Sequence, residues 1–104
     1  MKVIWSSEAT KSIEVIYDFY YSKSERAANK IITDIYNATL LLSQQPFMAP
    51  IEPALKDLPK TYRSMVVRQL FKLIYRVDEE KQEVIIMTIW DCRQNPKNLR
   101  KRIP

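Results

Sequence analysis

The chain has 104 residues, of which 46% are hydrophobic and 28% are charged, and its formal net charge is +5. This length and composition predict one folded, water-soluble domain over 1–104 with a single modest core. The sequence has no histidine, no glycine and a single cysteine, Cys92. These counts exclude an intramolecular disulfide, a cysteine–histidine zinc cluster and a glycine-rich phosphate loop, so we expect no metal and no cofactor.

The first 45 residues predict one short strand followed by two helices. Residues 2–5 form a short apolar run typical of a strand. Apolar side chains then recur at helical spacing over 9–20, and Ser6 is the expected N-cap of this helix. A capping-box spacing that begins at Ser22 predicts the start of a second helix, which continues through 27–42.

Four aromatic side chains lie close together near the end of the first predicted helix: Tyr17, Phe19, Tyr20 and Tyr21. Side chains at these four positions cannot all face one core. We therefore expect two of them to be exposed, where a partner protein or a second copy of the chain could cover them.

The second half of the chain predicts an irregular connector and three consecutive strands. Four prolines fall within fourteen residues and predict a connector without regular structure: Pro46, Pro50, Pro53 and Pro59. Apolar runs over 62–68, 70–77 and 83–91 predict the strands. The last run is apolar at nearly every position, so its strand should be central, between the first and third strands of the chain. The order β-α-α-β-β-β predicts an α+β fold, in which a two-helix hairpin packs on one face of an antiparallel sheet.

Positive charge is concentrated in the second half of the chain. Residues 1–45 hold five basic and five acidic residues, whereas 60–76 and 93–104 each hold five basic and no acidic residues. An antiparallel sheet can bury one face and leave the other in water. We therefore expect one outward, cationic face that carries these side chains, with the last two at its margin: Arg63, Lys72, Arg76, Arg93, Arg68 and Lys97.

This charge favours an anionic partner, either nucleic acid or an acidic protein segment, ahead of a membrane surface. The strand cations also have a simpler interpretation as solvent-facing residues that discourage edge pairing. Cys92 is expected to be a small buried side chain, and residues 97–104 a flexible basic tail. No segment is apolar enough for a signal peptide or a membrane span, so we expect a cytoplasmic protein.

Several segments in combination resemble the RelE/ParE superfamily, the toxins of bacterial type II toxin–antitoxin modules, which include plasmid stabilisation proteins. The resemblance covers nearly the whole chain and lies in Met1-Lys2-Val3-Ile4-Trp5-Ser6, Glu52-Pro53-Ala54-Leu55-Lys56-Asp57-Leu58, Tyr62-Arg63, Lys72-Leu73-Ile74-Tyr75-Arg76-Val77 and Asp91-Cys92-Arg93-Gln94-Asn95-Pro96. It implies a toxin held inactive by a cognate acidic antitoxin, which could cover the exposed helical aromatics; a homodimer is the alternative. RelE-like members cleave mRNA on the ribosome and ParE-like members poison DNA gyrase, and the shared fold does not choose between them.

For mRNA cleavage, the resemblance implies roles for four residues. Lys72 takes the place of the arginine that faces the scissile phosphate, and Arg93 matches the arginine that ends the last strand. Arg63 aligns with a lysine near the nucleophile. Glu52 aligns with the glutamate that serves as base in one branch of the family, although a carboxylate beside a proline is more often an exposed loop residue.

The resemblance is incomplete in the residues that transfer protons. The terminal tyrosine or histidine of the nucleases has no counterpart here, since Asn95, Pro96 and Leu99 stand nearby and none is a useful acid. Three functions therefore stay open: ribosome-dependent mRNA cleavage, gyrase inhibition without catalysis, and an inactive or repurposed homologue that binds nucleic acid. In each, we expect these side chains to contact nucleic acid: Arg68, Arg76, Lys97, Arg100, Lys101 and Arg102.

Overall fold

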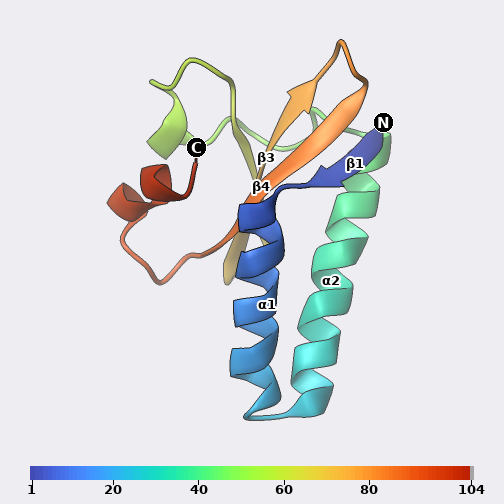
Figure 1. Ribbon diagram of the computed structural model, residues 1–104, viewed down its shortest axis with the longest axis vertical. Coiled ribbons are helices and arrows are strands. Elements are labelled where there is room, and N and C mark those ends of the chain that lie inside the picture. The colour runs from blue at the N-terminus through green and yellow to red at the C-terminus, as the bar shows by residue number, and fades with distance from the viewer. Residues whose placement is uncertain (104) are drawn as a thin grey trace.

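Two helices lie along one face of a four-stranded sheet, as Figure 1 shows for the computed structural model, which describes residues 1–103. The elements in chain order are β1 (Lys2–Trp5), α1 (Ser7–Tyr21), α2 (Glu25–Gln44), the 3-10 helix η1 (Pro53–Leu55), β2 (Arg63–Val67), β3 (Phe71–Asp78), β4 (Glu83–Asp91) and the 3-10 helix η2 (Pro96–Arg102). The predicted α+β class and the β-α-α-β-β-β order are confirmed. Neither long helix combines the length and apolar content that crossing a bilayer requires.

The strands are ordered β1-β4-β3-β2, so β4 is central, between β1 and β3, as predicted. The prediction of a purely antiparallel sheet is wrong for one pair, because β1 runs parallel to β4. Short turns force antiparallel pairing only among β2, β3 and β4. A long helical connection separates β1 from the other strands, and a connection of that length leaves the direction of β1 unconstrained.

Each face of the sheet has its own apolar cluster. The larger cluster lies under the helices and includes Ile13, Ile31, Ile35, Leu73, Tyr75, Ile86 and Ile89. The smaller one lies on the back of the sheet and is formed by Leu55, Tyr62, Ile74, Met87, Trp90 and Leu99. Because Leu55 and Leu99 come from η1 and η2, burial of apolar area fixes both 3-10 helices against the sheet.

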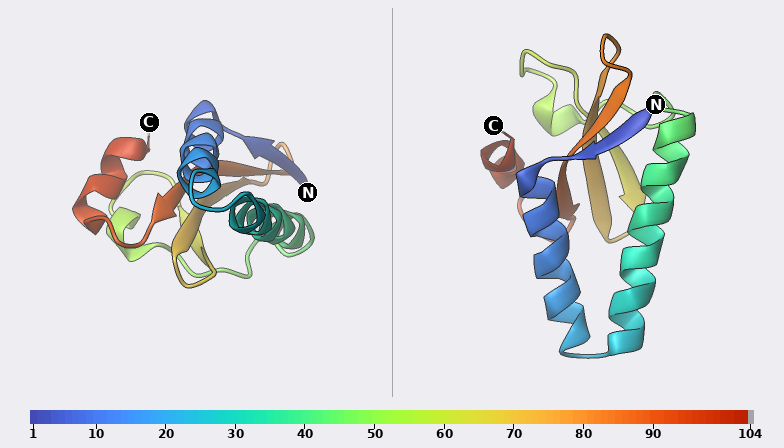
Figure 2. Two further views of the ribbon diagram at one scale, coloured as in Figure 1. Left: turned by 90° about the horizontal axis from the view of Figure 1, so that it is seen from below. Right: turned by 45° about the vertical axis from the view of Figure 1, so that its right-hand side comes forward.

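This packing changes the prediction for the C-terminal residues. Residues 97–102, expected to form a flexible tail, lie in η2, where Leu99 is only 1% exposed. The guanidinium of Arg100 also donates to Asp57 at 2.6 Å, which joins η2 to the residues just after η1. Figure 2 shows η1 and η2 side by side. Residue 104 of the expected tail lies outside the described residues.

The helix caps are partly as predicted. Ser6 caps α1, because its hydroxyl accepts a hydrogen bond from the Ala9 N–H. The predicted cap of α2 at Ser22 is wrong. Ser22 still belongs to the end of α1, where its N–H donates to the Asp18 carbonyl, and the N-cap of α2 is Ser24, whose backbone is extended.

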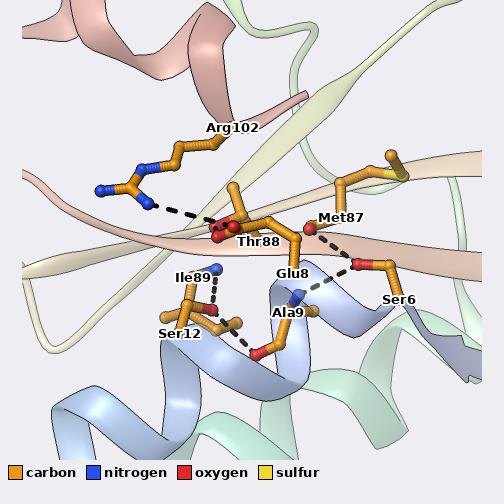
Figure 3. Close-up of polar contacts among 8 residues, drawn as sticks. All are labelled: Ser6, Glu8, Ala9, Ser12, Met87, Thr88, Ile89 and Arg102. Carbon is orange, nitrogen blue, oxygen red and sulfur yellow. Dashed lines mark hydrogen bonds and ion pairs between the residues drawn. The ribbon is translucent and has the colours of Figure 1, made fainter. Parts of the chain in front are cut away.

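Side chains from the N-cap and the first turns of α1 complete the free edge of β4. β1 ends at Trp5 opposite Ile86, so the edge of β4 beyond that point lacks a strand partner and faces α1. The Ser6 hydroxyl donates to the Met87 carbonyl at 2.8 Å, and the Ser12 hydroxyl accepts from the Ile89 N–H at 2.9 Å (Figure 3). Buried backbone groups are costly when left unpaired, so these serines fix the position of α1 on the sheet.

Both hairpin turns use a left-handed backbone without glycine. The β2–β3 turn contains Arg68 and Gln69 at φ of 57° and 55°, and the β3–β4 turn contains Gln82 at 55°. A side chain in this conformation crowds its own carbonyl, which costs about 1 kcal/mol relative to glycine. The turns therefore hold strain that the packing of the strands must offset.

Replacing Gln69 with glycine should stabilise the protein. Gln69 is exposed, so the change removes left-handed strain without creating a cavity. We expect a gain of about 1 kcal/mol in the free energy of unfolding, measured by urea denaturation. Gln45→Gly, at a residue with negative φ, is the control and should destabilise. A loss of stability in Gln69→Gly would show that the turn is not strained.

Candidate functional site

Lys72 lies on the back of the sheet and forms an ion pair with Glu52. Its Nζ is 2.7 Å from Glu52 Oε1, and the side chains are 33% and 3% exposed respectively. The other carboxylate oxygen of Glu52 accepts from the Ala54 N–H at 2.8 Å and so caps η1. The interpretation of Glu52 as an exposed loop carboxylate is therefore wrong, since it is one of the most buried charged groups.

The connector brings Glu52 to this place by pairing with the start of β2. The Glu52 N–H donates to the Tyr62 carbonyl at 2.9 Å, and Ile51 forms a β-bridge with Arg63. Burial alone would raise the pKa of the Glu52 carboxyl. The Lys72 ammonium and the hydrogen bond from Ala54 outweigh burial and hold this pKa below its usual value. Glu52 is thus a stabilised carboxylate at neutral pH.

Arg63 lies on the opposite face from Lys72. It pairs with Tyr75, whereas Lys72 pairs with Val66, and side chains alternate between the two faces along β2. The Arg63 guanidinium donates to the Ala49 carbonyl at 2.7 Å and lies 5.3 Å from the centre of the Phe47 ring. Its contacts are therefore with the segment that follows α2, on the helix side of the sheet.

Arg93 follows β4 and forms a bidentate pair with Asp91, with N–O distances of 3.0 and 2.7 Å. The Arg93 hydrogen bond is the main reason that the pKa of Asp91 is lowered. Arg93 also lines a groove beside α1 that contains Glu8, Glu14 and Asp18. The groove also contains Lys11 and Arg102, so acidic and basic side chains are mixed around Arg93.

The prediction that these cationic side chains share one face of the sheet is therefore wrong. Lys72 and Arg76 alternate onto the back of the sheet, Arg63 points to the helix side, and Arg93 lies beyond the end of β4. Arg63, Lys72 and Arg76 do lie on strands, as predicted. The sequence does not show which face of the sheet each side chain occupies, because a shift of one residue in register exchanges the two sides of a strand.

The remaining predicted contact residues divide into paired and unpaired cations. Arg68 pairs with Asp34 of α2 at 2.6 Å, and Arg102 lies 4.0 Å from Glu8 (Figure 3). Within residues 1–103 these cations have no ion-pair partner: Arg76, Lys97 and Lys101. The expectation that Cys92 is buried is wrong, because it is exposed just beyond β4.

Two exposed lysines in the segment after η1 were not among the predicted contact residues. Lys56 and Lys60 follow η1, and the Arg100–Asp57 ion pair joins that segment to η2. The sequence did not indicate them, because they are distant from η2 along the chain. The two segments are brought together by the buried leucines Leu55 and Leu99, which a search for clustered charge does not detect. The prediction that two helical aromatics are exposed is confirmed for Phe19 and Tyr21.

The comparisons with known proteins identify a family and, separately, a shared fold. The model of the family described as ParE toxin of type II toxin-antitoxin system, parDE, matches residues 3–96. Among solved structures, a chain of the chromosomal ParDE TA system from P. aeruginosa superimposes with a TM-score of 0.71 and 24% identity, over 88% of this chain and 95% of that one. At that identity the likeness shows a shared fold. Among proteins of curated function, no match was found.

The stability of the protein should depend on pH in the way expected for an ionised, ion-paired Glu52. Because its pKa is lower in the folded state, the pair's contribution is complete above the pKa of an unfolded glutamate, about 4.3, and is lost as the pH falls through the lower native value. We expect the stability difference between the wild type and Glu52→Gln, measured by urea denaturation, to shrink between about pH 5 and pH 3. Glu80→Gln, on the exposed β3–β4 turn, is the control and should parallel the wild type. A constant difference for Glu52→Gln would contradict this assignment.

Proposed function

The chain belongs to the ParE toxin family of type II toxin–antitoxin systems, and we propose that it is a non-enzymatic inhibitor of DNA gyrase. In this proposal a cognate acidic antitoxin holds the toxin inactive in the cytoplasm, and the net charge of +5 suits such a partner. The family match supports the toxin and its antitoxin. The choice of gyrase rests on how the site residues are arranged.

The choice of gyrase inhibition over RNA cleavage depends on the ion pair between Lys72 and Glu52. Cleavage of RNA requires cations that face the scissile phosphate and groups that move protons at its two ends. Here the Lys72 ammonium is bound to a buried carboxylate. Separating a fully buried pair costs about 3–5 kcal/mol, and somewhat less here because Lys72 is partly exposed. Lys72 is thus better suited to hold Glu52 than to receive a phosphate.

Ribosome-dependent mRNA cleavage is the competing function. It would require Lys72 to leave Glu52 and to act together with Arg63, which lies on the other face of the sheet. It would also require a proton donor near Leu99, whose side chain is buried against η1. A toxin that acts by binding needs none of these rearrangements, and for this reason we favour gyrase.

Purified toxin should inhibit DNA supercoiling by gyrase and leave mRNA on ribosomes intact. The decisive variant is Glu52→Gln with Lys72→Met, which removes both charges of the pair and leaves no lone buried charge. We expect this variant to retain most of the gyrase inhibition, because neither residue contacts the target in our proposal. Adding the purified antitoxin should restore supercoiling.

The opposite pattern would contradict the proposal. If wild-type toxin cuts mRNA within codons on purified ribosomes and the double variant does not, the pair belongs to a nuclease site. Circular dichroism of both proteins shows whether a loss of activity reflects unfolding.

A further inference from the structure

The net positive charge of the protein is carried by two segments that the fold brings together. Residues 53–61 carry two basic residues and one acidic residue, and residues 92–103 carry five basic residues and no acidic one. The two segments thus hold six net positive charges, whereas the rest of the chain has a net charge of −1. We call the surface formed by Lys56, Lys60, Lys97, Arg100 and Lys101 the η-surface.

The η-surface stands on a fixed support. Leu55 of η1 and Leu99 of η2 are both buried in the cluster on the back of the sheet. The Arg100–Asp57 ion pair joins the two segments at 2.6 Å and neutralises the one acidic residue among them. The lysines therefore project from a framework whose position apolar packing determines, although each lysine side chain is itself exposed.

The four lysines of the η-surface are available to a ligand. Lys56, Lys60, Lys97 and Lys101 are exposed, and none of them forms an ion pair with another residue in the part of the chain that the structure describes. Their ammonium groups are separate point charges rather than members of internal pairs. This differs from Lys72, Arg68 and Arg93, each of which has a carboxylate partner.

The chemistry of the η-surface indicates what kind of ligand it suits. None of the exposed large apolar side chains of residues 1–103 falls within 53–61 or 92–103. The large apolar residues of these two segments, Leu55, Leu58, Leu99 and Ile103, belong to the cluster on the back of the sheet or pack against it. Single-stranded nucleic acid is usually held by exposed aromatic rings that stack on its bases. Protein partners are usually held by exposed aromatic or aliphatic anchors. Lysines without such anchors suit the regular phosphates of a duplex.

We propose that the η-surface binds the phosphate backbone of duplex DNA. The biological meaning rests on the proposed function: the toxin would contact, through these lysines, the DNA segment that gyrase holds. Binding of this kind is independent of base sequence, because phosphate contacts position a protein without reading bases. It would raise the local concentration of toxin at the enzyme without forming part of the contact with gyrase itself.

The salt dependence of binding gives the proposal a quantitative form. If each of the four lysines neutralises one phosphate, the logarithm of the binding constant falls with the logarithm of salt concentration at a slope of about −3.6. Affinity should then fall roughly 150-fold between 50 and 200 mM salt. Removing two of the lysines should reduce the slope to about −1.8.

The test is fluorescence anisotropy of a labelled 24-base-pair duplex with the full chain, over a range of salt concentrations. Lys97→Gln with Lys101→Gln should lower the affinity at 50 mM salt by at least tenfold and reduce the slope by about two. Lys23→Gln with Lys30→Gln makes the same charge change near the turn between α1 and α2, far from η1 and η2 in Figure 1. This control should retain the slope of the wild type.

Equal slopes in the two double variants would overturn the proposal, because binding would then depend on total charge and not on the η-surface. Tighter binding of a single-stranded RNA of the same length would also overturn it. Gyrase supercoiling is assayed on the same preparations, so the two proposals can fail separately. Gyrase inhibition without salt-dependent DNA binding contradicts the η-surface alone, whereas DNA binding without gyrase inhibition supports the η-surface and contradicts the proposed function.

Discussion

The ion pair between Lys72 and Glu52 determines how the back of the sheet is organised. The Glu52 carboxylate accepts hydrogen bonds from the Lys72 ammonium and from the Ala54 N–H. One carboxylate therefore both neutralises a cation of β3 and caps η1. Through η1 it sets the position of Leu55, against which η2 packs. A charge that would otherwise face solvent is thereby used to fix the connector, whereas the four lysines of the η-surface have no ion-pair partner within residues 1–103.

The two faces of the sheet are covered in different ways. The helix side carries the larger core, and Ser6, the N-cap of α1, and Ser12 of α1 complete the edge of β4. The back carries a small cluster covered by short 3-10 helices rather than by long elements. Such a covering buries little area, so polar links such as Arg100–Asp57 contribute to holding it in place. The exposed lysines lie on this thin outer layer.

Much of the fold could be predicted from the sequence, because helical spacing, the proline-rich connector and the apolar run at 84–90 are local signals. The direction of β1 could not, since no local pattern records how a strand pairs across the helical hairpin. The candidate site was predicted less well. Arg63 and Lys72 were correctly placed on strands, but their faces depend on a register that the charge pattern does not specify. The partner of Lys72 lies twenty residues away in an irregular segment, and nothing in that segment distinguishes a buried glutamate from an exposed one. The burial of Leu99 was missed for a similar reason, because its neighbours in the sequence are all polar or basic.

A double-mutant cycle on the free energy of unfolding tests most directly whether Glu52 engages Lys72. The cycle compares Glu52→Gln, Lys72→Met and the two changes together in urea denaturation at pH 7. The account predicts that the double variant is more stable than the sum of the single effects implies, with a coupling of at least about 1 kcal/mol, because each single change leaves the other charge without its partner. Effects that add to within about 0.5 kcal/mol would show that the two residues act independently, and would leave Lys72 free to serve another ligand.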